Sequence, residues 1–145
     1  MRFRGQFAFL SNFYSAPITP TGPEYPVHVQ DRTYATAEHL YQALKCANFV
    51  DAENIRNLDT PVEVKRYARH KPMRPDWNDV RIDIMKRIVK LKFDTHKHLR
   101  DRLIAIQEPI IEENTWGDTF WGMCNGTGKN VLGNILMVLR SEYAR

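Results

Sequence analysis

Apolar residues recur at helical spacing along residues 77–91, and no other feature of the chain constrains its fold more strongly. Residues three and four positions apart share one face of a helix, so the spacing predicts a long helix with one side in a core. Asp76 stands directly before this run and is a suitable N-cap residue. The predicted core face consists of Trp77, Val80, Ile84, Ile88 and Leu91, and the predicted solvated faces carry Arg81, Lys86, Arg87 and Lys90.

Further helices are predicted by capping residues and by the same spacing. Thr60, Pro61 and Glu63 combine a capping box with proline at the first helical position, which predicts a helix from about residue 61 to 69. Thr36 is a suitable N-cap for an earlier helix. The face of this helix consists of Ala37, Leu40, Tyr41, Leu44 and Asn48. Another helix is predicted by Leu99, Leu103 and Ile106, and a terminal helix by Val131, Ile135, Leu136 and Leu139.

Two stretches have the character of short strands. Val27 and Val29 alternate with polar neighbours, as in a half-buried strand, so we expect a small sheet or hairpin within residues 3–30. Ile110 and Ile111 could form another short strand before a polar loop. Together with the helices, these patterns predict an α+β, mostly α-helical single domain over residues 1–145, with a small N-terminal β element.

Composition and charge agree with one folded domain and narrow its partners. A chain of 145 residues, with 43% hydrophobic and 26% charged residues, fits a single core. The formal charge of +4 favours anionic partners such as phosphates but is too small for a polybasic nucleic-acid coat. The basic run from Lys86 to Lys92 is interpreted as a solvated helix face, although Arg66, Arg69, Lys71 and Arg74 could add to a basic patch.

Three features of the sequence bear on where the protein is found and on whether it binds a metal. Cys46 and Cys124 lie far apart without metal-ligand spacing, which favours reduced thiols in a reducing compartment. The apolar run at residues 7–10 is too short for a signal peptide or a membrane span. The five histidines show no recurring ligand pattern. We therefore expect a cytoplasmic protein with no membrane partner and no metal; the sequence does not define its oligomeric state.

A stripe of polar residues follows the first predicted helix beside its apolar face. Glu38, Gln42 and Lys45 are separated by four and three positions, so a helix aligns them on one side. A carboxylate, an amide and an amine could then point into one pocket. The alternative is a solvated helix face with weak ionic pairing, and spacing alone favours this simpler interpretation.

The loop between residues 114 and 130 combines aromatic residues with a carboxylate and glycines. Trp116 and Trp121 beside Asp118 suit the binding of a flat ring. Residues 126–130 could offer backbone N–H groups and the Lys129 amine to a phosphate at a helix N-terminus, or they could be a tight turn that enters the last helix. They are not a Walker A loop, because Met123 replaces the required first glycine, so nucleotide triphosphate hydrolysis is disfavoured.

Several separately placed motifs run in order from about residue 3 to residue 140, and together they resemble the NADAR (YbiA-like) family. The motifs are Phe3-Arg4-Gly5, Leu10-Ser11-Asn12-Phe13-Tyr14, Thr36-Ala37-Glu38-His39, Tyr41-Gln42-Ala43 with Lys45, Arg74-Pro75-Asp76-Trp77, Asn114-Thr115-Trp116-Gly117-Asp118, Trp121-Gly122, Gly128-Lys129-Asn130, Leu132-Gly133 and Leu136-Met137.

This resemblance implies a NADAR/YbiA-like fold and hydrolysis of N-glycosidic bonds in ribose-containing compounds, without a metal or an organic cofactor. The implied substrates are phosphoribosylamino-pyrimidine intermediates of riboflavin synthesis in some members and ADP-ribose attached to guanine in others. The implied partners are thus a substrate that contains ribosyl phosphate or ADP-ribose and, in the second case, ADP-ribosylated DNA.

The resemblance also implies roles for particular residues. By matching position, Glu38, Trp77 and Asp118 would be catalytic, with Lys45 as a covalent or electrostatic participant. The residues of the same motifs that we expect to contact the substrate are Arg4, Gly5, Ser11, Asn12, Phe13, Tyr14, Gln42, Asn114, Trp116, Trp121, Gly122, Gly128, Lys129 and Asn130.

The expected chemistry is consistent with these roles. Cleavage of a ribosyl C–N bond builds positive charge on the sugar, which a carboxylate stabilises while an acid helps the base to leave. Glu38 and Asp118 could divide these tasks, and a desolvated Lys45 could attack the opened C1′ aldehyde to form a Schiff base. A non-catalytic reader of ADP-ribose or modified nucleic acid, which would bind through Trp116 and Trp121, is the alternative function. The presence of both carboxylates and the lysine favours the enzyme.

Overall fold

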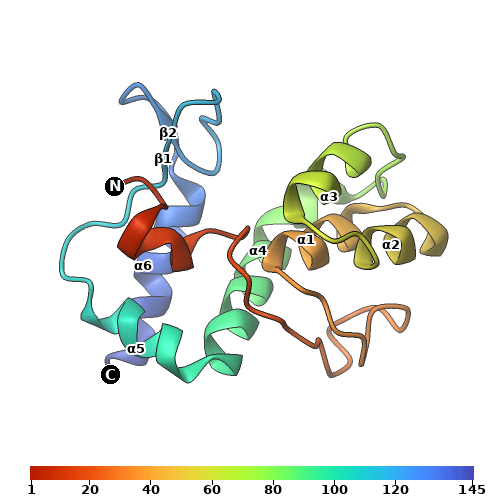
Figure 1. Cartoon of the computed structure of the whole chain (residues 1–145), viewed down its shortest axis with the longest axis horizontal. Helices are drawn as coiled ribbons and strands as arrows, with labels where there is room; N and C mark the ends of the chain where they lie inside the picture. The colour runs from red at the N-terminus through yellow and green to blue at the C-terminus, as the bar shows by residue number, and fades with distance from the viewer. The chain divides into compact units, whose positions relative to one another are not determined.

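The computed structural model describes every residue from Met1 to Arg145 and consists mainly of helices (Figure 1). Its residues form two compact units. The first contains Met1–Ser11 and Phe93–Arg145, and the second contains Asn12–Lys92. The mixed, mostly helical class predicted from the sequence is confirmed. None of the helices combines the length and the apolar character needed to cross a membrane.

The second unit is built around α1. It contains α1 (Ala37–Lys45), α2 (Phe49–Arg56), α3 (Pro61–Ala68) and most of α4 (Trp77–Thr95). Both α2 and α3 pack against α1 (Figure 1). Every residue of α1 from Ala37 to Leu44 is buried. The helix therefore lies inside its unit and not on its surface. The other buried apolar residues of the unit include Ala52, Ile55, Val64, Ala68, Ile84, Met85, Ile88 and Val89.

The predicted capping residues begin two of these helices. The Thr36 hydroxyl accepts from the N–H of His39 at 3.2 Å, and the Thr60 hydroxyl accepts from the N–H of Glu63 at 3.2 Å. The assignment of Asn48 to the first helix is wrong, because α1 ends at Lys45 and Asn48 caps α2 instead. Its side-chain oxygen accepts from the N–H of Asp51 at 2.9 Å.

The strand expected at Val27 and Val29 is also wrong. These residues belong to a turn in which the N–H of Val29 donates to the Pro26 carbonyl at 3.0 Å, and Val27 is 81% exposed. Proline lacks the N–H that a ladder needs, which disfavours a strand at this point. The β structure of this segment is limited to an isolated antiparallel bridge between Ile18 and Tyr34.

The first unit contains the strand pair. Its elements are the 3-10 helix η1 (Gly5–Leu10), the end of α4, α5 (Lys97–Ala105), β1 (Glu113–Asn114), β2 (Met123–Cys124) and α6 (Val131–Tyr143). The strands are parallel, with Glu113 opposite Met123 and Asn114 opposite Cys124, and they lie near the start of α6 (Figure 1). The strand predicted at Ile110 and Ile111 is wrong, because neither residue belongs to a strand and β1 begins at Glu113. Buried apolar residues of this unit are Phe9, Leu10, Phe93, Leu99, Leu103, Ile106, Ile110, Leu132, Ile135, Leu136 and Leu139.

Candidate functional site

The polar stripe of α1 is buried. Glu38 and Gln42 are each 7% exposed, and Lys45, at the end of the helix, is half-buried. The side-chain amide of Gln42 donates to Oε1 of Glu38 at 2.8 Å. The interpretation of this stripe as a solvated helix face is therefore wrong for the carboxyl and the amide. A buried carboxyl held by a neighbouring amide is a typical arrangement for acid–base chemistry.

The environment of Glu38 changes its acidity. Burial raises the pKa of the Glu38 carboxyl, while the hydrogen bond from Gln42 and the positive charges of Lys65 and Lys45 oppose that rise. Burial has the larger effect, so the carboxyl holds its proton to a higher pH than a free glutamic acid does. Glu38 is thus suited to donate a proton, and the nearby cations favour its return to the carboxylate form.

The side-chain oxygen of Gln42 has no hydrogen-bond partner. This atom, Oε1, is buried and accepts no hydrogen bond within the protein. A buried acceptor without a donor costs about 1–3 kcal/mol, so such groups are uncommon outside sites that have a function. An N–H or O–H group of a ligand could satisfy this oxygen, which lies on the same side chain that holds Glu38.

The N-terminal motif reaches α1 within the second unit. The carbonyl of Asn12 accepts from the N–H of Glu38 at 3.0 Å, and the Asn12 side chain donates to the sulfur of Met85 at 3.3 Å. The Lys65 ammonium lies 5.9 Å from the centre of the Phe13 ring. Asn12 and Phe13 are therefore brought to the start of the helix that carries Glu38. The sequence offered no sign of Lys65, which lies 27 positions beyond Glu38 in a different helix.

Trp77 packs against α1, as its place on the core face of α4 predicts. Its side chain is 4% exposed, and its ring lies 5.0 Å from the Tyr41 ring at an interplanar angle of 61°. The preceding segment is tied to the same helix, because the N–H of Arg74 donates to the Lys45 carbonyl at 2.9 Å. Trp77 thus helps to fix the end of α1. A contact between its ring and a substrate remains a prediction.

Lys92 was assigned to a solvated helix face, and that assignment is wrong. The residue is 1% exposed, and its ammonium lies 5.8 Å from the centre of the Tyr14 ring. Burial lowers the pKa of Lys92 to about 7. The signal in the sequence was its spacing, because Lys92 follows Ile88 by four positions and Ile84 by eight and so falls on the apolar stripe.

In the first unit, Asn114 and Asp118 organise the polar loop. Oδ1 of Asn114 accepts from the N–H of Asp118 at 3.0 Å, and its amide donates to the Asp118 carbonyl at 2.8 Å. Oδ1 of Asp118 accepts from the N–H groups of Phe120 at 3.0 Å and Trp121 at 2.9 Å. The Asp118 carboxylate is therefore held in a fixed position by the turn that follows it.

The N–H groups before α6 are occupied by carbonyls of the same loop. Lys129 donates to the Thr119 carbonyl at 2.8 Å, and Asn130 donates to the Gly122 carbonyl at 3.2 Å. The first helical N–H, of Val131, donates to another carbonyl of this loop at 3.1 Å. These groups are not available to a phosphate, so the geometry favours the tight turn over the phosphate cradle. The Lys129 side chain is exposed and remains able to meet an anion.

Asn130 acts as a clamp inside this loop. Its Oδ1 accepts from the N–H of Glu112 at 2.9 Å, and its amide donates to the Ile110 carbonyl at 3.0 Å. Its backbone is left-handed, with φ of 53°, which asparagine tolerates better than most residues. Close packing surrounds the clamp, because a side chain at Gly122 would collide with Glu112 and one at Gly128 with the Gly122 carbonyl. These residues shape the loop, whatever else they do.

The remaining predicted contact residues differ in exposure. Trp116 is 64% exposed, whereas Trp121 is half-buried and meets Phe120 edge to face at 4.8 Å between ring centres. Arg4 and Gly5 are exposed at the start of η1, and Ser11 is half-buried just after it.

The predicted set thus falls into two groups, one in each unit. The second unit holds Asn12, Phe13, Tyr14, Glu38, Gln42, Lys45 and Trp77, and the first holds Arg4, Gly5, Ser11, Asn114, Trp116, Asp118, Trp121, Gly122, Gly128, Lys129 and Asn130. No group of three or more His, Cys, Asp or Glu side chains is arranged to hold a metal ion.

Comparisons with known proteins cover nearly the whole chain. The profile of the NADAR domain matches residues 2–144. The N-glycosidase YbiA of Escherichia coli (strain K12) is 36% identical over 123 residues, which cover 83% of this chain and 77% of that protein. The riboflavin biosynthesis protein VVA0006 of Vibrio vulnificus (strain YJ016) is 34% identical over 137 residues, or 92% of this chain and 35% of that protein. The NMR structure of E. coli YbiA gives a TM-score of 0.82 at 32% identity and covers 99% of this chain and 84% of that one.

Proposed function

This chain belongs to the NADAR family, and we propose that it is a hydrolase that cleaves the N-glycosidic bond between a base and ribose. The observation that carries the proposal is the buried Glu38 carboxyl, which is held by Gln42 and has a raised pKa. Loss of a base requires a proton for the departing nitrogen, and a carboxyl of this kind can supply one. The names of the relatives support the same reaction class.

Glu38 can act twice in this reaction. Gln42 donates to Oε1, so Oε2 is the oxygen that carries the proton. In the first step, that proton passes to the base nitrogen as the C1′–N bond breaks. The resulting carboxylate then stabilises the positive charge on the ribose until water adds to C1′. The charges of Lys45 and Lys65 make the ionised state of Glu38 accessible during this step.

We assign the second carboxylate role to Asp118. Water must lose a proton as it adds to C1′, and a carboxylate is a suitable acceptor. Two backbone N–H groups fix Oδ1 of Asp118, so the direction of its charge is set before the substrate binds. Such preorganisation lowers the cost of reaching the transition state.

Lys45 provides a covalent variant of the same reaction. Its amine would attack C1′ of the opened ribosyl imine, and the base would leave as its free amine. Water would then hydrolyse the Schiff base, which regenerates lysine and releases the sugar with an aldehyde at C1′ and its phosphate still attached. Borohydride reduction during turnover should trap a ribosyl adduct on Lys45, and Lys45→Arg should abolish trapping because guanidinium stays protonated. Full turnover in that variant would exclude the covalent route and leave the two carboxylates.

Two substrate classes fit this chemistry. One is a phosphoribosylamino-pyrimidine, which agrees with the riboflavin biosynthesis proteins among the relatives. The other is ADP-ribose attached to guanine. Both contain a ribosyl C–N bond, a flat base that can stack on aromatic rings, and phosphate that can meet exposed lysines such as Lys129.

The test is direct incubation with each substrate, followed by mass analysis of the released base. We expect release from at least one of them, and Glu38→Gln should slow that release by about two orders of magnitude or more. Tight binding of both compounds without release of either base would contradict the proposal and would favour the non-catalytic reader.

A further inference from the structure

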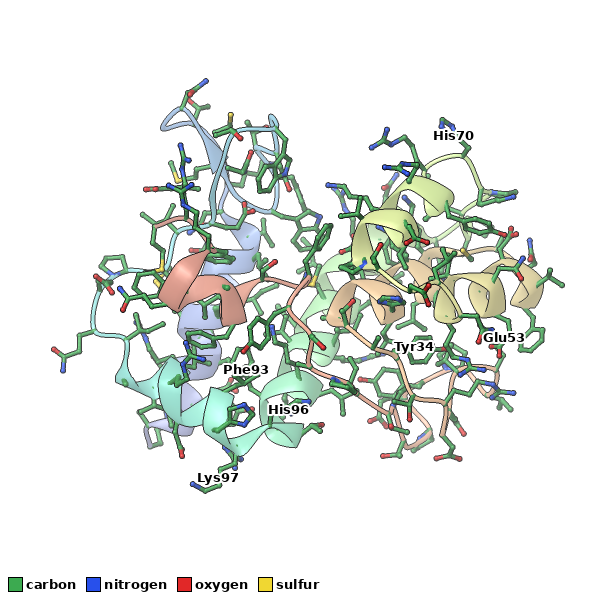
Figure 2. The ribbon with its side chains drawn as sticks, viewed as in Figure 1. Tyr34, Glu53, His70, Phe93, His96 and Lys97 are labelled. Carbon is green, nitrogen blue, oxygen red and sulfur yellow. The ribbon has the colours of Figure 1, made fainter.

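The hydroxyl of Tyr34 and Oε1 of Gln42 are both buried in the second unit without a hydrogen-bond partner. Tyr34 lies on the side of the unit that also holds Glu53 (Figure 2). Burial raises the pKa of Tyr34 to about 12, and the charges of Glu53, Arg56 and Arg32 act on it as well. A hydroxyl proton can rotate toward such groups. The Tyr34 hydroxyl therefore does not require a ligand.

The oxygen of Gln42 has no comparable freedom. The amide is planar, and its Nε2 donates to Oε1 of Glu38 at 2.8 Å, so this bond sets the direction of the Gln42 oxygen. The two residues are one turn apart on α1, and each is 7% exposed. Gln42 therefore holds a fixed acceptor directly beside the carboxyl that is proposed to donate the proton.

A proton donor and an acceptor placed side by side make two demands on the nitrogen that leaves. The nitrogen must accept the proton of Glu38 with a lone pair, and it must present a hydrogen to Gln42. An amine nitrogen that links a base to ribose carries one of each. The nitrogen that joins base and ribose in an ordinary nucleoside belongs to a ring and carries no hydrogen. A substrate of that kind would leave Oε1 of Gln42 buried and unsatisfied.

We propose that Gln42 is a specificity-determining residue, whose Oε1 accepts from the N–H of the reacting nitrogen and so rejects N-ribosides in which that nitrogen belongs to a ring. This inference rests on the proposed function and deepens it, because the sequence predicts a substrate contact for Gln42 but no role. A site that hydrogen-bonds an N–H of its substrate discriminates strongly against an analogue that lacks it. Ordinary nucleotides should thus stay intact in its presence.

The hydrogen bond to Gln42 also becomes stronger during the reaction. As the proton passes from Glu38 to the nitrogen, the nitrogen becomes positively charged, and its N–H becomes a better donor. Gln42 therefore stabilises the transition state more than the bound substrate, which raises turnover as well as affinity. The base leaves as a free amine that carries its own hydrogen and the proton of Glu38. The covalent route through Lys45 needs the same N–H, because only a nitrogen that can lose a proton forms a neutral imine.

The experiment compares the binding of two ligands that cannot be cleaved, by titration calorimetry. Both are carbocyclic analogues of a phosphoribosylamino-pyrimidine, in which a methylene group replaces the ring oxygen of the ribose. One ligand joins sugar and base through N–H. The other joins them through an ether oxygen, which can accept from Glu38 but cannot donate to Gln42. Wild type should bind the amino-linked ligand at least about tenfold more tightly than the ether-linked ligand.

Three variants identify the residue that causes this preference. Gln42→Met removes the acceptor and should bind both ligands with similar affinity. Gln42→Glu keeps an oxygen that can accept and should retain the preference for the amino-linked ligand. Gln30→Met is the matched control, because the Gln30 amide donates to the Tyr25 carbonyl at 2.7 Å in a turn of the same unit. This control should show the wild-type preference.

Equal affinities in wild type would overturn the role of Gln42, and so would a preference that persists in Gln42→Met or disappears in Gln30→Met. If Gln42→Met does not fold, wild type and Gln42→Glu still decide, because both must prefer the amino-linked ligand. Release of adenine from 5′-AMP as fast as base from a phosphoribosylamino-pyrimidine would also overturn it. Binding requires no turnover, so a preference without release of base from any N-riboside would contradict the proposed function alone.

Discussion

The α1 stripe and the 114–130 loop both unite carboxylates with amides, yet they use them differently. In α1, the Glu38 carboxyl receives one hydrogen bond from Gln42, whose own oxygen has no partner. In the loop, Asn114 and Asn130 make several bonds each, almost all of them to backbone groups. Polar groups that the fold leaves unsatisfied are available to a ligand, whereas groups that the backbone occupies maintain the shape of the chain.

Asp118 lies between these two cases. Its carboxylate accepts from two backbone N–H groups through Oδ1, and none of the hydrogen bonds to the loop uses Oδ2. The comparison therefore predicts that substitutions in the loop mainly lower stability and that substitutions in the stripe mainly lower turnover. For Asp118, the choice of the replacing residue should decide which of the two falls.

The largest loss of stability is expected when the Asn130 clamp is removed. Asn130→Ala leaves the N–H of Glu112 and the carbonyl of Ile110 without partners, at about 1–3 kcal/mol for each buried group. Alanine in a left-handed conformation adds about 1 kcal/mol. Urea denaturation should show both losses, and Asn130→Gly should recover only the backbone part. If Asn130→Ala has wild-type stability but no turnover, Asn130 contacts the substrate and does not stabilise the loop.

Glu38→Gln should instead lower turnover without a loss of stability. It removes the proton donor and its negative charge, so turnover should fall by about two orders of magnitude or more while ligand binding persists. Stability at neutral pH should not fall, because the buried carboxyl no longer has to ionise. A parallel fall in thermal stability and turnover would mean that Glu38 maintains the fold.

The pH dependence of stability sharpens this prediction. Burial raises the folded-state pKa of Glu38, so its contribution to stability is fully present below the unfolded value of about 4.3 and is lost as pH rises through the folded value. The stability of Glu38→Gln relative to wild type should therefore increase from pH 4 to pH 7. Melting temperatures at the two pH values measure the difference.

Asp118→Asn should separate charge from shape. Asparagine keeps an oxygen that can accept from Phe120 and Trp121, so the melting temperature should stay within a few degrees of wild type, while turnover should fall by about tenfold or more. Asp118→Ala loses the acceptor as well and should be less stable. Full turnover in Asp118→Asn would place this residue with the structural amides of the loop.

The smallest expected effect concerns Lys92, which is buried on α4 and not on the helix that carries the stripe. Its folded pKa is about 7, and the unfolded value is about 10.4, so the unfolded chain binds more protons between these values and stability rises with pH. Urea denaturation from pH 7 to pH 9 should show this rise in wild type and its absence in Lys92→Met. Identical pH profiles would mean that Lys92 is not buried in solution.

Local patterns were sufficient for much of the helical fold. Thr36 and Thr60 cap the helices that they were predicted to cap, because a cap involves residues only three positions apart. The second helix was missed because its residues have no clear apolar face and because Asn48 was assigned to the preceding helix. The strand at Val27 was overpredicted because alternation alone ignores the effect of neighbouring prolines.

Long-range contacts account for the part of the candidate site that the sequence could not predict. The spacing aligned Glu38 and Gln42, but their burial results from the elements packed around α1. The bonds of Asn130 extend back 18 and 20 positions, and no local pattern marks residues that interact at such a distance. Lys92 is a partial exception, since its helical spacing did indicate the apolar face.

The Asn130 clamp also determines how this part of the chain can open. A single side chain joins residues 110 and 112 to the start of α6, while the N–H groups of residues 129–132 donate to carbonyls of residues 119–122. Fraying from one end cannot release this closed set of bonds. Its amide hydrogens should therefore exchange with solvent as one cooperative unit, so that any rearrangement of the loop around a ligand takes place in one concerted step.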